Sequence, residues 1–142
     1  MEWFSFIAAD EHLGIETQYI YRVVDDVKIT PVPLTPSCYM GLLYYRGELF
    51  DVVHLGNLLK QEKAKRKDGE WIILLKWSGK KLGFFPDRVR GLVWVEDQEG
   101  SQRIHIEEKE TIRLITPDLI WNKLLEFSYG YSKIPENIQP GI

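Results

Sequence analysis

Apolar and polar residues alternate over many short stretches of the chain, and turn-forming residues separate these stretches. Alternation with a period of two is typical of strands that bury one face. The pattern predicts nine short strands, at residues 3–9, 13–15, 41–45, 48–54, 71–77, 81–86, 89–95, 103–106 and 111–115. Turn signals recur about every 8–12 residues, a spacing typical of small antiparallel barrels or sandwiches. The fold class expected from the pattern is therefore mainly β.

Helical signals occur at three places. Thr116-Pro117-Asp118 predicts a helix start, because it offers a capping hydroxyl, a proline for the first helical position and an early acid. Residues 55–61 predict a short helix. Between residues 17 and 24 the apolar spacing favours a short helix capped by Thr17, although period two also fits in part.

The sequence predicts a single domain over residues 1–142, a length within the usual range for one domain. Prolines at positions 31, 33 and 36 predict an extended loop before the strand at 41–45. A polar loop is expected at about 60–70, and an irregular tail at about 128–142, where glycine and proline recur.

Composition and charge exclude several classes of protein. Apolar residues make up 44% and aromatic residues 13%, which excludes a disordered chain. The formal net charge is -3, so no global basic field exists for a nucleic acid or an anionic membrane. The single cysteine, Cys38, excludes an internal disulfide, and neither a secretory signal nor a spanning helix is apparent. We expect a cytoplasmic protein without direct membrane insertion.

The sequence offers no convincing catalytic or metal-binding motif. His12, His54 and His105 lie far apart and show no ligand spacing with Cys38, so we expect neither a metal nor another cofactor. Cys38 is interpreted as a small buried hydrophobe rather than a nucleophile. We therefore expect a protein that is not an enzyme. A small-ligand or enzymatic barrel would require a pocket lined by convergent polar groups, for which the sequence gives no candidate.

A basic stretch at residues 60–67 supports an alternative function as a small-barrel nucleic-acid-binding protein. Its core is Lys63-Ala64-Lys65-Arg66-Lys67, flanked by acids and without the interleaved aromatics that stack on bases. We favour a solvated loop and expect no nucleic-acid partner.

The stretch Gly41-Leu-Leu-Tyr-Tyr-Arg-Gly-Glu-Leu-Phe-Asp-Val-Val-His-Leu55 resembles the signature of CheW-like domains, in which an Arg-Gly pair joins two apolar strands. Three further stretches are similar to family motifs in order and spacing: Phe4-Ser5-Phe6, the proline loop at 29–36, and residues 82–89. Together they cover residues 3 to about 95. The chain departs from the family pattern at four positions, with Tyr44 for Asn, Asp51 for Pro, His54 for Asp and Pro86 for Val.

This resemblance implies two small antiparallel β-barrels, or SH3-like subdomains, that share a hydrophobic core and carry a short C-terminal helix. It also implies a non-enzymatic adaptor for signal transduction. The implied partners are the regulatory domain of a CheA-like histidine kinase and the cytoplasmic tip of a chemoreceptor.

The hairpin at residues 41–54 has the composition of a protein-binding surface, because aromatic residues and arginine dominate interface energetics. The residues expected to contact a partner are Tyr44, Tyr45, Arg46, Glu48, Phe50 and Asp51. Strand alternation sends the two tyrosines to opposite faces, so one can be core while the other is exposed. For Arg46, a structural ion pair with Glu48 or Asp51 is the alternative to partner contact. His54 is expected to be a satisfied histidine at a strand end, with a pH-responsive contact as the alternative.

Overall fold

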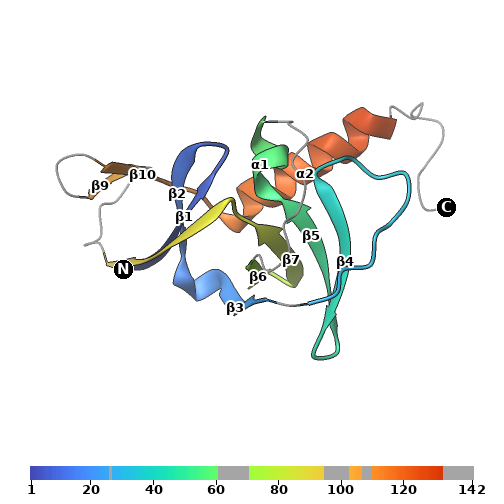
Figure 1. Cartoon of the computed structure of the whole chain (residues 1–142), viewed down its shortest axis with the longest axis horizontal. Coiled ribbons are helices and arrows are strands. Elements are labelled where there is room, and N and C mark those ends of the chain that lie inside the picture. The colour runs from blue at the N-terminus through green and yellow to red at the C-terminus, as the bar shows by residue number, and fades with distance from the viewer. Residues whose placement is uncertain (26, 61–70, 95–102, 107–109, 133–142) are drawn as a thin grey trace.

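Two five-stranded sheets form the body of the molecule (Figure 1). The structure, a computed structural model, describes residues 1–25, 27–60, 71–94, 103–106 and 110–132. Sheet A has the strand order β8 (Arg88–Trp94), β1 (Glu2–Ala8), β2 (Glu11–Glu16), β10 (Glu110–Leu114), β9 (Arg103–Ile106). Sheet B has the order β3 (Ile20–Val24), β6 (Ile72–Trp77), β7 (Lys80–Phe85), β5 (Glu48–His54), β4 (Tyr39–Tyr45). The expected fold class is confirmed, although each sheet contains one parallel pair, β2 with β10 and β5 with β7.

Sheet B is covered on both faces, which explains the uninterrupted apolar run at Ile72–Leu75. Successive residues of a strand point to opposite faces. Ile73 and Leu75 therefore enter the core that lies between the two sheets, while Ile72 and Leu74 enter a second core on the other side of sheet B. Leu74 is fully buried in this second core, together with Phe50 and Phe85.

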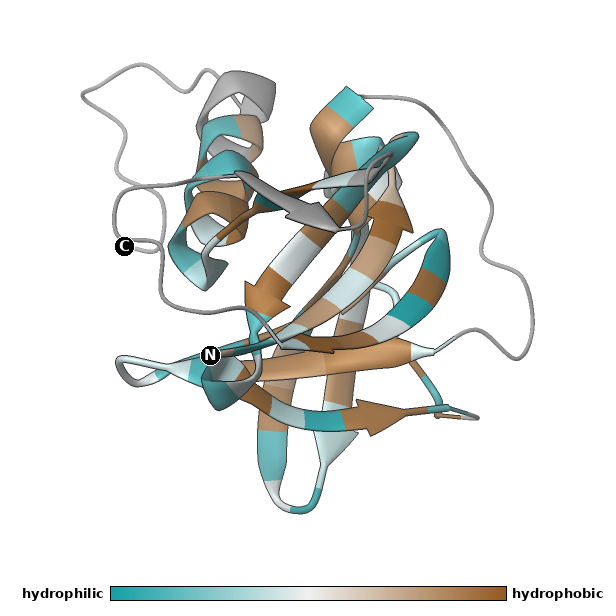
Figure 2. Ribbon diagram, turned by 90° about the vertical axis from the view of Figure 1, so that its left-hand side faces the viewer, coloured by the Kyte–Doolittle hydropathy of each residue, from teal (hydrophilic) through white to brown (hydrophobic). Residues whose placement is uncertain are grey.

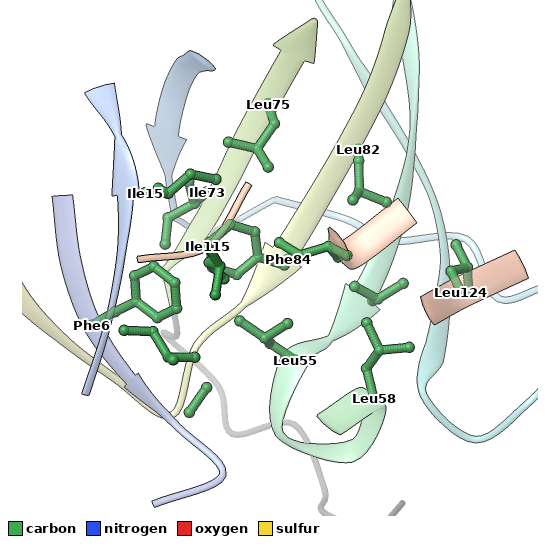
Figure 3. Close-up of a cluster of buried hydrophobic side chains, with 14 of the residues drawn as sticks. Phe6, Ile15, Leu55, Leu58, Ile73, Leu75, Leu82, Phe84, Ile115 and Leu124 are labelled. Carbon is green, nitrogen blue, oxygen red and sulfur yellow. The ribbon is translucent and has the colours of Figure 1, made fainter. Parts of the chain in front are cut away.

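Side chains of both sheets contribute to the core that lies between them. Figure 3 shows Phe6 and Ile15 of sheet A converging with Phe84 of sheet B. Two helices also contribute side chains to this core. Leu55 and Leu58 belong to α1 (Leu55–Lys60), and Ile120 and Leu124 belong to α2 (Pro117–Ser132). The shared core that the family resemblance implies is thus present.

An isolated antiparallel bridge pairs Thr30, in the segment after β3, with Leu42 of the edge strand β4. The backbone N–H of Thr30 donates to the carbonyl of Leu42 at 2.8 Å, and Leu42 returns the bond to Thr30 at 2.8 Å. This close approach requires glycine at position 41. A Cβ at Gly41 would lie 2.2 Å from the carbonyl oxygen of Thr30, and the residue has a φ of 133°.

The helix signal at Thr116-Pro117-Asp118 is confirmed, because the Thr116 hydroxyl accepts the N–H of Leu119 at 3.3 Å at the start of α2. The short helix expected at 55–61 is α1. α2 continues to Ser132, so the first residues of the expected irregular tail are helical. Residues 133–142 lie outside the described residues.

The helix expected between residues 17 and 24 is wrong for most of its length. Only Thr17–Tyr19 forms a single 3-10 turn, η1, and Ile20–Val24 is strand β3. β3 pairs antiparallel with β6, about fifty residues further along the chain. The β-branched residues Ile20, Val23 and Val24 fit such a strand, and this long-range pairing decides between the two periodicities.

Candidate functional site

The β4–β5 hairpin projects from sheet B, and its tip extends beyond the neighbouring strands (Figure 1). Figure 2 shows hydrophobic residues along the strands and mainly hydrophilic ones near the hairpin turn, at the bottom of the view. The turn consists of Arg46 with a φ of 48° and Gly47 with a φ of 85°. Two positive φ values are the signature of a type I′ turn, which matches the twist of the flanking strands.

Arg46 occupies the first turn position at a conformational cost. Glycine, asparagine and aspartate adopt this left-handed conformation most readily, whereas a long side chain pays a penalty there. The Arg46 side chain is exposed, and its guanidinium carbon lies 5.4 Å from the centre of the Tyr45 ring. Arginine at this position is therefore not explained by turn stability.

An exposed apolar pair lies directly behind the tip. Tyr44 is 69% exposed and faces Leu49, which is 55% exposed, across the two strands. Leu49 was not among the residues expected from the sequence. The signal was nevertheless present, because a two-residue turn fixes the register and sets residue 44 opposite residue 49.

Tyr45 and Phe50 lie on the opposite face of the hairpin, toward the second core. Tyr45 is half-buried and packs edge-on against Tyr21, with ring centres 6.2 Å apart. Phe50 is fully buried and stacks on Tyr21 at 6.0 Å. The expectation that Phe50 offers surface to a partner is thus corrected, because strand alternation places it inside sheet B's own core. Of the two tyrosines, Tyr44 is the exposed one.

Glu48 pairs with lysines from the neighbouring strands rather than with Arg46. Its carboxylate accepts from Lys76 Nζ at 2.9 Å and lies 3.4 Å from Lys81 Nζ. The hydrogen bond from Lys76 holds the pKa of Glu48 below its ordinary value, and the charge of Lys81 adds to the effect.

Asp51 is engaged by a tyrosine of its own sheet. The Tyr39 hydroxyl donates a hydrogen bond of 2.6 Å to Asp51 Oδ1. Burial, and then this bond, raise the pKa of the Tyr39 phenol well above its ordinary value. The structural alternative for Arg46, an ion pair with Glu48 or Asp51, is therefore not formed among the described residues.

His54 caps helix α1, which begins at the next residue. Its Nδ1 accepts the backbone N–H of Asn57 at 3.2 Å, and its Nε2 lies 3.9 Å from Asp87 Oδ1. The side chain is 3% exposed. An imidazole nitrogen thus takes the capping role that a carboxylate oxygen can fill, which confirms the expected satisfied histidine.

The sequence model of the CheW-like domain matches residues 2–118 of the chain. The chain belongs to the CheW-like domain family. The match extends beyond residue 95, where the motifs visible in the sequence end.

Relatives of this CheW-like domain come from several bacteria. The chain is 28% identical to the chemotaxis protein CheW of Helicobacter pylori over 101 residues, which cover 70% of the chain and 60% of that protein. It is 28% identical to CheW of Thermotoga maritima over 69% of the chain and 64% of that protein. Protein FrzA of Myxococcus xanthus is 34% identical over 45% of the chain and 40% of FrzA. The matches thus span less than two thirds of each curated relative.

Among solved structures, the scaffolding protein TtCheW from Thermoanaerobacter tengcongensis superposes with a TM-score of 0.66. The superposition covers 80% of the CheW-like chain and 87% of TtCheW, at 23% sequence identity. This likeness shows that the two proteins share a fold.

A cavity of about 570 Å³ lies away from the hairpin, at one end of sheet A. Its lining residues are Ile7, Asp10, His12, Asp87, Arg88, Arg90 and Thr111. The acids in it have structural partners. Asp10 accepts from Lys60 at 2.7 Å, a bond that lowers the pKa of Asp10, and Asp87 accepts the backbone N–H of Ala9 at 2.9 Å.

Outside the hairpin and the cavity, the remaining candidates from the sequence are Cys38, a metal site and the basic run. Cys38 is buried, and burial raises the pKa of its thiol. A nucleophilic cysteine needs a lowered pKa, because the thiolate is the reactive form. No group of three or more potential metal ligands occurs within the described ranges. The basic run at 63–67 lies outside the described residues. No helix of the described part of the chain is long and apolar enough to cross a membrane.

Proposed function

We propose that this CheW-like domain is a non-enzymatic adaptor that couples a chemoreceptor-type sensor to a histidine kinase through protein–protein contacts. The family match and the names of the relatives support the adaptor role. The proposal places the protein in the cytoplasm, where the kinase regulatory domain and the receptor tip would meet it.

The proposed docking surface is the hairpin tip, with Tyr44 and Leu49 on its outer face and Arg46 at the turn, over the ring of Tyr45. The observation that carries this proposal is Arg46 itself. An exposed arginine stands where a type I′ turn favours asparagine or glycine, so a role other than folding is the simplest reason for its presence. The adjacent Tyr44 and Leu49 supply apolar contact area that the chain leaves exposed.

Tyr45, Glu48 and Asp51 have supporting roles in this proposal. Tyr45 lies beneath the Arg46 guanidinium and orients it. The carboxylates of Glu48 and Asp51 are engaged by partners within the chain. We therefore assign direct partner contact first to Tyr44, Arg46 and Leu49.

Calorimetric titration of the protein with a CheA-like kinase regulatory domain and with a chemoreceptor tip from the same organism tests the proposal. Wild type should bind at least one of them. Tyr44→Ala and Arg46→Asn should each weaken binding about tenfold or more, as interface anchors do. Arg113→Gln, on β10 of sheet A, serves as the control and should bind normally. Absence of binding to both partners by wild type would contradict the adaptor role, and normal binding by both tip variants would exclude the tip as the docking surface.

A further inference from the structure

A connected group of cations lies at the end of sheet B beside the hairpin turn. Lys76 and Lys81 are opposite each other on β6 and β7, and both reach Oε1 of Glu48, at 2.9 and 3.4 Å. Each lysine side chain remains more than one third exposed. One carboxylate therefore holds two ammonium groups, and the cluster keeps an excess of positive charge.

Two arginines join this group through contacts with the rings of Tyr21 and Tyr45. Lys76 Nζ lies 4.6 Å and the Arg22 guanidinium carbon 4.9 Å from the centre of the Tyr21 ring. Tyr21 contacts Tyr45 edge-on, and Arg46 lies over Tyr45. These contacts link four cations with one carboxylate, that of Glu48, on a chain whose overall formal charge is -3. We name the group formed by Arg22, Arg46, Lys76, Lys81 and Glu48 the cationic cluster.

The tyrosine rings in the cluster are already used by the protein. Tyr21 stacks on the buried Phe50 at an interplanar angle of 13° and contacts both Lys76 and Arg22. A nucleic acid would need free ring faces for its bases as well as cations for its phosphates. The cluster offers the cations without such free faces, which favours carboxylate groups of a protein over a nucleic acid.

We propose that the cationic cluster is a docking site for an acidic segment of a partner protein, with Lys76 and Lys81 as its central contacts. The inference rests on the proposed function in that it extends the docking surface from the hairpin tip to the end of sheet B. Glu48 acts within it as an internal competitor, because its carboxylate occupies the lysines that the partner's acid would bind. Lys–carboxylate pairs of this kind contribute charge-assisted hydrogen bonds and accelerate encounter.

Fluorescence anisotropy with a labelled oligoglutamate peptide tests the site without any knowledge of the partner. Wild type should bind the peptide at low salt, and added salt should weaken this binding. Lys76→Met combined with Lys81→Met should weaken it about tenfold or more. Glu48→Gln should tighten it several-fold, a gain of binding that a merely damaged fold would not produce.

Two controls make the outcome decisive. Arg88→Met combined with Lys123→Met removes the same charge from sheet A and α2 and should leave binding unchanged. Peptide binding that is absent, or that responds equally to both double variants, would overturn the proposal. Tighter binding of oligothymidylate than of oligoglutamate would also overturn it, in favour of a nucleic-acid ligand. If the kinase domain binds wild type and the Lys76/Lys81 double variant equally, the adaptor role stands and only the acidic docking site falls.

Discussion

The indole Nε1 of Trp77 donates a hydrogen bond of 2.8 Å to Oδ1 of Asp118, and this bond connects strand β6 to the first turn of α2. The same carboxylate oxygen lies 3.5 Å from Lys80 Nζ, and the Trp77 ring packs edge-on against Trp121 at 5.8 Å. An acid in the first helical turn also interacts favourably with the helix dipole. Asp118 thus stabilises the first turn of α2 and links the helix to sheet B.

We predict that the stabilisation from Asp118 depends on pH. The hydrogen bond from Trp77, and then the charge of Lys80, hold the pKa of Asp118 below its ordinary 3.8. A lowered pKa of a carboxyl group stabilises the folded state above the unfolded pKa, and this contribution is lost as the pH falls through the folded pKa. The stability advantage of wild type over Asp118→Ala should therefore be present at neutral pH and shrink below about pH 4.

Urea unfolding at a series of pH values measures this advantage. Asp25→Ala, which removes an exposed acid just beyond β3, is the control and should show a smaller difference from wild type at neutral pH. An advantage over Asp118→Ala that stays constant down to pH 3 would show that the carboxylate charge plays no part.

Arg46→Asn should separate stability from binding. Asparagine adopts the left-handed conformation of the first turn position more readily than arginine, so the variant should be more stable by about 0.5–1 kcal/mol. The same change should weaken partner binding, because it removes the guanidinium from the proposed docking surface. Thermal unfolding checks the first effect, and a variant less stable than wild type would show that Arg46 serves the fold.

Gly41→Ala should destabilise the protein strongly. The new methyl group would lie 2.2 Å from the backbone oxygen of Thr30, and alanine would have to adopt a φ of 133°. We expect a loss of about 2–4 kcal/mol from strain and overpacking together. Chemical denaturation measures it. Gly79→Ala, at a turn where a Cβ would meet nothing within 4 Å, should cost clearly less.

Leu74→Ala should test the second core of sheet B. Leu74 is fully buried, and its removal leaves a cavity among side chains that can collapse only in part. The expected loss of unfolding free energy is ~2–5 kcal/mol. Leu49→Ala, on the exposed side of the hairpin, should change stability little, and equal losses in the two variants would contradict the assignment of the two faces.

The hairpin and the start of α2 could be predicted from the sequence because their determinants are local. Residues 46 and 47 set a two-residue turn, and Thr116-Pro117-Asp118 contains the helix start within three consecutive positions. β3 could not be assigned in this way, since its strand pairing is with β6, far along the chain. The position of Leu49 opposite Tyr44 also follows from the local register of the two-residue turn.

The alternating pattern, the turns and the CheW-like signature can all be recognised from the sequence, because each depends on neighbouring residues. The sequence did not determine which side of each strand is covered. The packing of the strands shows that Phe50 is buried in the core, that Tyr44 is exposed and that Glu48 pairs with Lys76 and Lys81. The physical reason is that burial and ion pairing depend on which strands pack together, and alternation along one strand specifies two faces without saying which of them meets a neighbour.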